Sequence, residues 1–250
     1  MSDPIKVSVV TACYNSEKTI GTTIRSVNSQ SYGNIEHVFI DGGSADDTLA
    51  VISFGAQGNY SVLSEPDNGI YDALNKGIER ASGDVVGFLH ADDFYANDDV
   101  VERIAECFIE PDVQAVYGDL QYVSQIDTDK VIRTWDTKAF NPGRLRRGWM
   151  PPHPTLYVRK EWYDTVGGFD TQYRIAADYL CVLQLFSNPG FTSVYLPEVL
   201  VKMRVGGASN RSLKNMMKKS CEDYLILKRT GKGGIRTLLG KNLRKLMQFL

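Results

Sequence analysis

The sequence IYDALNKGIERASGDVVGFLHADD, at residues 70–93, decides the fold. Apolar and small residues recur in it every three or four positions from Ile70 to Ala81, which predicts an amphipathic helix. Gly83 is expected to end that helix, and the apolar run at 85–89 is typical of a buried strand. A helix followed at once by such a strand is the repeating unit of a sheet whose main strands run parallel.

The same alternation of strands and helices surrounds this stretch. It predicts an α/β domain with a mainly parallel central sheet flanked by helices, in which Ser16 is the N-cap of the first helix. Residues 115–175 hold short strands, Pro and Gly, and are expected to form an irregular second half of the same domain. Further strands are predicted at residues 5–11, 35–41 and 60–65, and further helices at 16–31, 46–54 and 98–108.

Composition favours an ordinary globular protein. The chain has 250 residues, a formal net charge of −2, 43% hydrophobic and 23% charged residues, which suits one large domain or one domain with an appendage. No apolar run reaches eighteen residues, and the first residues do not resemble a signal peptide. The four cysteines stand far apart without a CxxC pair, so we expect no zinc or redox site and a cytoplasmic location.

Charge divides the chain into a body, residues 1–210, and a tail, residues 211–250. The body holds 17 basic and 28 acidic side chains, whereas the tail holds 11 basic and 2 acidic ones. This asymmetry predicts different partners for the two parts. Nucleic-acid binding is disfavoured because the body is acidic and aromatic residues do not interleave with the basic ones.

Adjacent carboxylates follow the strand predicted at 85–89. In parallel sheets ligands collect beyond the carboxyl ends of the strands, where His90, Ala91, Asp92 and Asp93 would lie. The two aspartates can cap the turn before the next helix. They can instead hold Mg²⁺ or Mn²⁺ through oxygen, with water and a diphosphate completing the coordination shell.

A second carboxylate, Asp41, closes the strand predicted at 35–41 and precedes two glycines. It either forms a turn through its own side chain or accepts a hydrogen bond from a base or sugar. The stretch is not a GxxxxGK[ST] loop, which excludes a P-loop NTPase, and the absence of GxGxxG disfavours a dinucleotide dehydrogenase.

Two further residues carry chemistry in the second half. Asp178 stands where an apolar helix begins, so it is either the N-cap or a general base whose proton affinity is raised by apolar neighbours. His153 lies between Pro152 and Pro154 in a rigid, non-helical stretch, where a structural and a ligand-binding role are equally plausible.

Five segments in order resemble one known family. They are VSVVTACYNSEKTI at 7–20, VFIDGGSADDT at 38–48, SEPDNGIYDALNKGI at 64–78, GFLHADD at 87–93 and HPTLYVRKEWYDTVGGFDTQYRIAADYL at 153–180, and GGASN at 206–210 is also similar. The chain resembles the nucleotide-sugar glycosyltransferases of family 2, which have the GT-A fold. The similarity is greatest to the bacterial enzymes that build O-antigen, capsule and exopolysaccharide repeat units.

The resemblance implies a GT-A domain at residues 1–210, with a nucleotide-binding half at 1–110 and an acceptor half at 111–210, followed by the basic amphipathic helical tail. It implies that Tyr14 lies against the base, that Asp41 contacts the base, and that Asp178 is the catalytic base. His90-Ala91-Asp92 occupies the DxD metal motif, with His in place of the first Asp. The implied set comprises Thr11, Ala12, Tyr14, Asn15, Asp41, Asp67, Asn68, Gly69, Asn75, His90 and Ala91 for the nucleotide sugar, Asp92 and Asp93 for the metal, and His153, Arg204, Gly207 and Ser209 for the acceptor or diphosphate side.

The function implied is an inverting, metal-dependent transfer of a sugar from a nucleotide sugar, by resemblance a UDP-sugar, to a saccharide acceptor that is often polyprenyl-diphosphate-linked. GDP and dTDP remain open as nucleotides. His90 motivates the alternative of a catalytically weak nucleotide-sugar-binding protein. A nucleotidyltransferase is disfavoured because the first residues lack a glycine-rich, basic phosphate loop.

The tail is expected to form two amphipathic helices separated by glycines. They can pack on the body or on a second subunit of a homodimer, or rest on the inner face of the cytoplasmic membrane as a basic surface helix. The predicted apolar stripes are Leu213, Met216, Met217, Cys221, Tyr224 and Leu225, and then Ile235, Leu238, Leu239, Leu243, Leu246, Met247 and Leu250.

Overall fold

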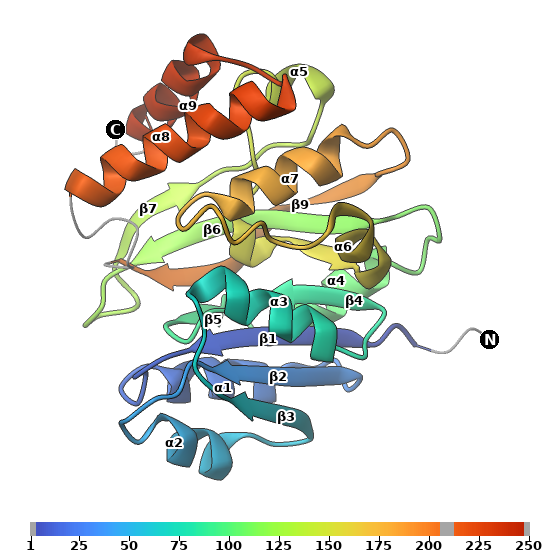
Figure 1. Ribbon diagram of the computed structural model, residues 1–250. Coiled ribbons are helices and arrows are strands. Elements are labelled where there is room, and N and C mark those ends of the chain that lie inside the picture. The colour runs from blue at the N-terminus through green and yellow to red at the C-terminus, as the bar shows by residue number, and fades with distance from the viewer. Residues whose placement is uncertain (1–3, 206–212, 248–250) are drawn as a thin grey trace.

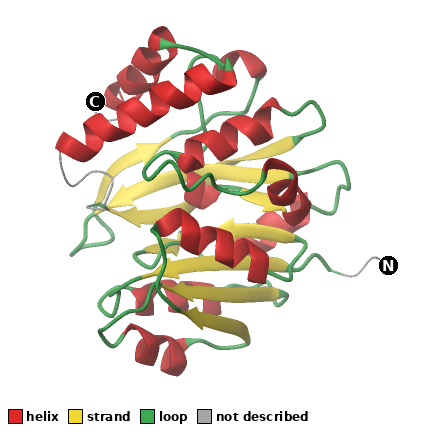
Figure 2. Ribbon diagram, in the orientation of Figure 1, coloured by secondary structure: helices red, strands yellow, loops and turns green. Residues whose placement is uncertain are grey.

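The computed structural model describes residues 4–205 and 213–247, and these form a single nine-stranded sheet with helices on both faces (Figures 1 and 2). The strand order is β3-β2-β1-β4-β8-β6-β9-β5, with β7 paired to β6. The strands are β1 (Val7–Cys13), β2 (Ile35–Asp41), β3 (Asn59–Ser64), β4 (Val85–Phe88), β5 (Asp93–Tyr95), β6 (Ala115–Val123), β7 (Val131–Trp135), β8 (Tyr157–Arg159) and β9 (Ser193–Arg204).

The larger strands share one direction, as predicted. β1 is parallel to β2 and β4, β2 to β3, and β6 to β9, whereas β5, β7 and β8 run antiparallel to their neighbours. Cys13 at the end of β1 lies level with Asp41 at the end of β2, and Asp41 lies level with Ser64 of β3. The carboxyl ends of the first three strands therefore form one edge.

Helices cover both faces because successive side chains of the strands alternate between two cores. Val10 faces the core beneath α3, α6 and α7, whereas Val9 faces the core beneath α1 and α4. The helices are α1 (Ile20–Asn28), α2 (Thr48–Gly55), α3 (Ile70–Arg80), α4 (Val100–Cys107), α5 (Pro142–Leu145), α6 (Lys160–Val166), α7 (Ala177–Ser187), α8 (Leu213–Thr230) and α9 (Ile235–Met247), and η1 is a 3-10 turn at His153–Thr155.

Close packing sets the height of α3 above the sheet. A Cβ on Gly77 would come within 2.2 Å of Cγ1 of Val10, so only glycine permits this approach. The helix ends earlier than predicted, because Ala81 is already extended (ψ 130°) and the backbone N–H of Gly83 donates to the Ser8 hydroxyl. Gly83 therefore joins the turn before β4 rather than ending the helix.

The start of α1 also differs from the prediction. The helix begins at Ile20, and Ser16 forms a preceding turn in which its carbonyl accepts the N–H groups of Thr19 and Ile20. The N–H of Ser16 donates to the hydroxyl of Thr48, 2.7 Å away. Ser16 therefore ties this loop to α2 and is not the N-cap.

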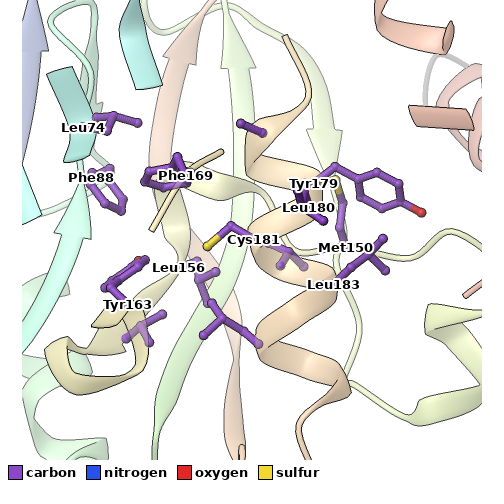
Figure 3. Packing of buried hydrophobic residues seen from close by; sticks show 14 of the residues in the cluster. Leu74, Phe88, Met150, Leu156, Tyr163, Phe169, Tyr179, Leu180, Cys181 and Leu183 are labelled. Atoms are coloured by element: carbon purple, nitrogen blue, oxygen red, sulfur yellow. The ribbon is translucent and has the colours of Figure 1, made fainter. Parts of the chain in front are cut away.

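An apolar core lies between β4, α3 and α7. Figure 3 shows Leu74, Phe88 and Phe169 grouped at one end of this core, with Leu180 and Cys181 of α7 beside them. All five side chains are buried, so the core fixes α7 relative to the end of β4.

The C-terminal helices belong to the same core. α8 contacts α7 and α9, and Ile226 and Leu227 of α8 are completely buried in the cluster that contains α7 (Figure 1). Packing on the body, one of the alternatives for the tail, is thus what the described residues show. No helix in these ranges is both long and apolar enough to span a bilayer.

The apolar stripe predicted for α8 does not face the core. Met217, Cys221 and Leu225 are exposed, and the helix instead buries Glu222 and Asp223 together with the two apolar residues named above. On α9, Leu238 packs against the core but Ile235 and Leu239 are exposed. The reason is that Glu222 accepts backbone N–H groups at the start of α7, whereas Asp223 pairs with Lys219 and with Lys241 of α9. The side chains of Leu213, Met216, Leu243, Leu246 and Met247, and the whole of Leu250, lie outside the described part of the chain.

Candidate active site

The strand order reverses between β1 and β4, because β2 and β3 lie on one side of β1 and β4 on the other. Such a reversal opens a crevice at the carboxyl ends of the strands, where ligands bind in open α/β sheets. Tyr14 and Asn15 follow β1 at this place, and His90 to Asp92 follow β4.

Two loops meet beside β1. The N–H of Asn15 donates to Oγ of Ser44 (2.8 Å), and Oδ1 of Asn15 accepts the N–H of Ala45 (2.9 Å). Asn15 has a left-handed φ of 47°, which its short amide side chain tolerates. The Tyr14 side chain remains 63% exposed, so its ring is available to stack against a ligand.

Thr11 and Ala12 lie inside β1 rather than beyond it, since the strand extends to Cys13. Thr11 is fully buried, and its hydroxyl donates to the carbonyl of Leu89 (2.8 Å) and lies 2.9 Å from Nε2 of His37. The predicted end of the strand at residue 11 is therefore wrong, because pairing with β2 continues for its whole length. The Thr11 side chain joins β1 to β4 rather than facing the crevice.

Asp41 is completely buried and forms the turn that the sequence allowed. It accepts the N–H groups of Gly43 (3.1 Å) and Ser44 (3.0 Å), the Ser64 hydroxyl (2.7 Å) and the Ser44 hydroxyl. Burial alone would raise the pKa of Asp41, but these hydrogen bonds outweigh it and lower the pKa. Asp41 thus fixes the loop after β2, and its contact with a base stays a prediction.

Gly42 lies between Tyr14 and Asp67. A Cβ at Gly42 would come within 2.5 Å of Oδ2 of Asp67 and 3.4 Å of Cδ2 of Tyr14. Asp67 accepts the N–H of Gly69 (2.8 Å). Gly69 has a φ of 115° and is the N-cap of α3, and the neighbouring Asn68 is exposed. The structure therefore brings these predicted nucleotide residues together around one glycine.

Asn75 holds the loop before α7. Its amide nitrogen donates to the carbonyl of Phe169 (2.9 Å), and its amide oxygen accepts the N–H of Phe169 (2.8 Å). The amide keeps one further N–H and one further lone pair, so the expected contact of Asn75 with ribose or diphosphate stays a prediction.

Two histidines face each other beyond β4. The ring centroids of His90 and His153 lie 6.0 Å apart, and His153 stacks on Phe88 at 4.9 Å. Within the described ranges, Nδ1 of His90 and Nε2 of His153 are buried without a hydrogen-bond partner. Burial lowers the pKa of His153 to about 4 and also lowers that of His90, so both imidazoles are neutral at pH 7.

Asp92 and Asp93 do not cap the following helix. α4 starts at Val100 after Asp99, and Asp93 begins β5, opposite Met203 of β9. Asp92 is half-buried, and its backbone carbonyl accepts Nη1 of Arg204 (2.6 Å). The capping interpretation is therefore wrong. Arg204 lies beside the motif, and its role on the acceptor or diphosphate side stays a prediction. Gly207 and Ser209 lie outside the described residues.

The Asp93 carboxylate is fully buried, and among the described residues neither of its oxygens has a well-formed hydrogen bond, although the backbone N–H of Arg204 acts on it as a nearby donor. Burial and the charge of Asp92 raise its pKa well above the usual value, against an opposing effect of Arg204. In residues 4–205 and 213–247, no three His, Cys, Asp or Glu side chains converge as a metal-binding group. One or two carboxylates are nevertheless the usual protein contribution where substrate phosphates supply the remaining ligands of Mg²⁺.

Asp178 is the second residue of α7, whose N-cap is Ala176. Its Oδ1 accepts the Tyr71 hydroxyl (3.1 Å) and the N–H of Tyr179 (2.8 Å). The expected N-cap role is wrong, because the N-cap lies two residues earlier, at Ala176.

The environment of Asp178 is charged rather than apolar. Burial would raise the pKa of Asp178, but Lys219, His153 and Lys241 together with the N–H of Tyr179 outweigh it, and the pKa is lowered. The predicted rise in proton affinity is therefore wrong, since α8 and α9 bring two lysines to this carboxylate. It is ionised at neutral pH.

The charges of Asp92 and Asp178 both act on His90. Burial lowers the pKa of His90, and the charges of both Asp92 and Asp178 oppose this effect, so both lie within electrostatic reach of its ring. His153 is likewise affected by Asp178 and by His90. Asp92, His90, His153 and Asp178 therefore line one region between the end of β4 and the start of α7.

Several residues of this region could not be singled out from the sequence. They are Tyr71, which bonds Asp178, and Lys219, Glu222 and Lys241 of the C-terminal helices. One signal was present, since Glu222 and Asp223 are the only acidic residues of the basic segment 211–250. An acidic pair kept within such a segment indicates partners inside the protein.

The site lies at the switch point of an open α/β sheet, and comparison with known proteins identifies the family. The sequence matches Glycosyl transferase family 2 over residues 8–171, and the chain belongs to that family. An uncharacterized glycosyltransferase of Mycobacterium tuberculosis is 34% identical over 189 residues, covering 74% of this chain and 70% of that protein. A PGL/p-HBAD biosynthesis glycosyltransferase of Mycobacterium bovis is 28% identical over 211 residues, 81% of this chain and 78% of the relative.

Solved structures agree with the fold. The structure of S. aureus TarS 1–349 in complex with UDP matches with a TM-score of 0.62 at 19% identity. The match covers 87% of this chain and 65% of the TarS chain. Mannosyltransferase PcManGT from Pyrobaculum calidifontis, in complex with GDP-Man and Mn²⁺, has a TM-score of 0.66 at 16% identity over 96% of this chain and 70% of that one. The predicted α/β GT-A fold is confirmed. Asp178, α8 and α9 lie beyond the residues matched by the family.

Proposed function

We propose that the chain is an inverting glycosyltransferase that moves a sugar from a nucleotide sugar to a hydroxyl group of a saccharide acceptor. The observation that carries this proposal is that the charges of both Asp92 and Asp178 act on His90, which follows β4 at the switch point of the sheet. One carboxylate is thus available for the donor's diphosphate side and the other for the acceptor. Membership of Glycosyl transferase family 2 supports the reaction class.

Asp178 is the general base of this proposal. Among the described residues the hydrogen bonds to its carboxylate go to Oδ1, so we assign Oδ2 to the acceptor proton. As that proton moves to Oδ2, the acceptor oxygen bonds the anomeric carbon, and the bond from this carbon to the diphosphate oxygen breaks. A single displacement of this kind inverts the configuration. The lowered pKa of Asp178 keeps its carboxylate unprotonated at neutral pH, as a general base requires.

Asp92 and Asp93 fit a divalent cation of the Mn²⁺ or Mg²⁺ type. Asp92 is half-buried, and the oxygens of the fully buried Asp93 next to it lack a well-formed hydrogen bond in the described part of the protein. When bound, such a cation stabilises negative charge on the leaving diphosphate. The mannosyltransferase structure with GDP-Man and Mn²⁺ supports this assignment. Arg204 beside Asp92 adds a fixed positive charge on the diphosphate side.

The nucleotide is assigned to the space between Tyr14 and Asp67 around Gly42, called the nucleotide slot below. The exposed Tyr14 ring would stack on the base, Asp67 to Gly69 would face the ribose, and Asp41 would hold the loop between them. The TarS structure with UDP supports a UDP-sugar as donor, and the GDP-Man complex supports keeping GDP in the test.

A screen of UDP-, GDP- and dTDP-sugars with Mn²⁺ tests the function directly. A ligand that binds only the native state raises the melting temperature, so the true donor should stabilise the chain and then be turned over when acceptor is added. Stabilisation by none of these sugars would contradict the proposal.

A second function, a nucleotide-sugar-binding protein with weak catalysis, rests on one specific observation. His90, at the first position of the metal motif, is neutral and cannot supply the negative charge of an aspartate. A binder would retain affinity for UDP without hydrolysing or transferring the sugar. Measured turnover of a stabilising donor therefore separates the two functions.

The acceptor is proposed to be lipid-linked, with the C-terminal helices against the cytoplasmic membrane. Met217, Leu225, Ile235 and Leu239 are 70%, 54%, 64% and 56% exposed, on helices rich in lysine and arginine. Exposed apolar residues within a basic helix are typical of a surface that rests on anionic lipid.

Co-sedimentation of the full chain with vesicles of phosphatidylglycerol tests this contact. Leu225→Glu with Ile235→Glu should reduce binding by at least about tenfold, since each change removes apolar contact and adds negative charge. Phe54→Glu is the matched control, because Phe54 is 91% exposed on α2, in the body, and it should bind like the wild type. Equal binding by all three proteins would remove the membrane contact from the proposal.

A further inference from the structure

Glu222 on α8 bonds the backbone at the start of another helix. Its carboxylate, in a residue only 8% exposed, accepts three successive backbone N–H groups, those of Arg174 (3.3 Å), Ile175 (2.9 Å) and Ala176 (3.0 Å). These groups lie at the entrance to α7, where N–H groups have no partner within the helix and negative charge is favourable. Glu222 thus caps α7 from a segment 46 residues later in the chain.

The same short segment is held from the opposite side by α3. The Tyr71 hydroxyl lies 2.9 Å from the carbonyl of Ile175 and 3.1 Å from Oδ1 of Asp178. Asp178 follows Ala176 by only two residues, so the position of its carboxylate depends on the backbone that Glu222 and Tyr71 hold. Misplacement of a reacting group by about 1 Å can cost about 10²-fold in rate.

An ion-pair network fixes α8 itself. Asp223, which is 2% exposed, pairs with Lys241 of α9 (2.9 Å) and with Lys219 (3.5 Å). Nζ of Lys241 also lies 3.2 Å from the ring centroid of Tyr179, the neighbour of Asp178. Because Asp223, the residue after Glu222, ties α8 to Lys241 of α9, the Glu222 carboxylate is held in place rather than free to follow α7.

We propose that Glu222 is a positioning residue for Asp178, and that α8 is therefore a structural part of the active site. This inference rests on the proposed function of Asp178 as the base. It gives the C-terminal helices a role in turnover that is separate from any contact with a membrane. It also predicts that damage to the bond between Glu222 and α7 affects catalysis more than donor binding, because the nucleotide slot lies at the ends of β1 and β2.

The test uses Glu222→Gln in the full chain. Oε1 accepts from Arg174 and Oε2 from Ile175 and Ala176, so an amide of the same size replaces one acceptor oxygen by a donor. We expect kcat to fall by about tenfold or more, within the range of such displacements, while the Kd for UDP with Mn²⁺ changes by less than about twofold.

Glu36→Gln is the matched control. Glu36 is also 8% exposed and accepts the N–H of Ser82 and the hydroxyls of Ser8 and Ser82, but it lies at the amino end of β2. It should lower the melting temperature to a similar extent without changing kcat. An unchanged kcat in Glu222→Gln, or equal losses of kcat in both variants, would overturn the inference.

A double variant separates positioning from general stability. If Glu222 acts through Asp178, adding Glu222→Gln to Asp178→Asn should slow turnover by less than about twofold further, because residues that act as a unit are not additive. A further drop equal to that of Glu222→Gln alone would show that Glu222 acts elsewhere. If Asp178→Asn itself turns over like the wild type, the proposed base fails instead, and the two failures are thereby distinguished.

Discussion

Asp41 at the end of β2 and Asp178 at the start of α7 are both carboxylates whose pKa is lowered despite burial, but by different means. Around Asp41 the donors are neutral, namely backbone N–H groups and serine hydroxyls of its own and the adjacent loop. Around Asp178 the opposing groups are, in order, Lys219 of α8, His153 and Lys241 of α9. The first arrangement fixes the shape of a loop, whereas the second keeps a single carboxylate ionised, and its hydrogen bonds to the described residues go to Oδ1.

The largest effect predicted by this comparison belongs to Asp178→Asn. The amide keeps the size of the side chain but cannot accept the acceptor proton, so kcat should fall at least about 100-fold. Calorimetry should show unchanged affinity for UDP with Mn²⁺. Asp164→Asn, which removes a charge from an exposed position on α6, is the control and should turn over normally. Near-normal turnover by Asp178→Asn would show that the two carboxylates do not differ in function as argued.

The next effect is on donor binding rather than turnover. Asp92→Ala should weaken binding of UDP in the presence of Mn²⁺ by at least about tenfold, equivalent to about 1.4 kcal/mol, because it removes the accessible carboxylate of the motif. Without Mn²⁺ the variant and the wild type should bind UDP alike. Equal affinities with Mn²⁺ would count against the metal assignment and leave the base unaffected.

The smallest effect at neutral pH is expected for Lys219→Met. Lys219 lowers the pKa of Asp178, so removal of the lysine charge raises that pKa. Because the base must be unprotonated, the acidic limb of the kcat/KM profile then moves to higher pH. Activity at high pH should be unchanged. The titratable groups that interact electrostatically with Asp178 are Tyr71, His90, Tyr122, His153, Cys181, Lys219 and Lys241.

Lys218→Met provides the matched control for this pH profile. Lys218 is the preceding residue of α8 and is exposed, so its removal should leave the acidic limb where it is. An identical profile for both lysine variants would show that α8 does not set the charge of Asp178.

Local sequence patterns predicted the main strands and helices of the first half of the molecule, but not all of their ends. Strand β2 was predicted to the residue, because its apolar run ends where the chain turns at Asp41, and α3 was predicted from its period to within one residue. The ends of β1 and α1 were misplaced, since pairing with β2 and the bond of Ser16 to Thr48 decide them. Patterns within one segment do not contain such partners.

The part of the site beyond α7 could not be predicted for the same reason. Glu222 bonds residues 46 to 48 positions earlier, and nothing near it in the sequence indicates that contact. The hydrophobic pattern of α8 even placed Met217 and Leu225 inside, where the structure has the carboxylates of Glu222 and Asp223. Buried charge overrides apolar periodicity when it meets fixed partners.

A crystal structure of the Asp178→Asn variant with Mn²⁺ and the donor found in the sugar screen tests the central claim most directly. Anomalous scattering should place Mn²⁺ against the carboxylate of Asp92, with the anomeric carbon of the sugar facing residue 178 across His90. Mn²⁺ bound away from Asp92, or a sugar on the opposite face of the sheet from α7, would contradict the account.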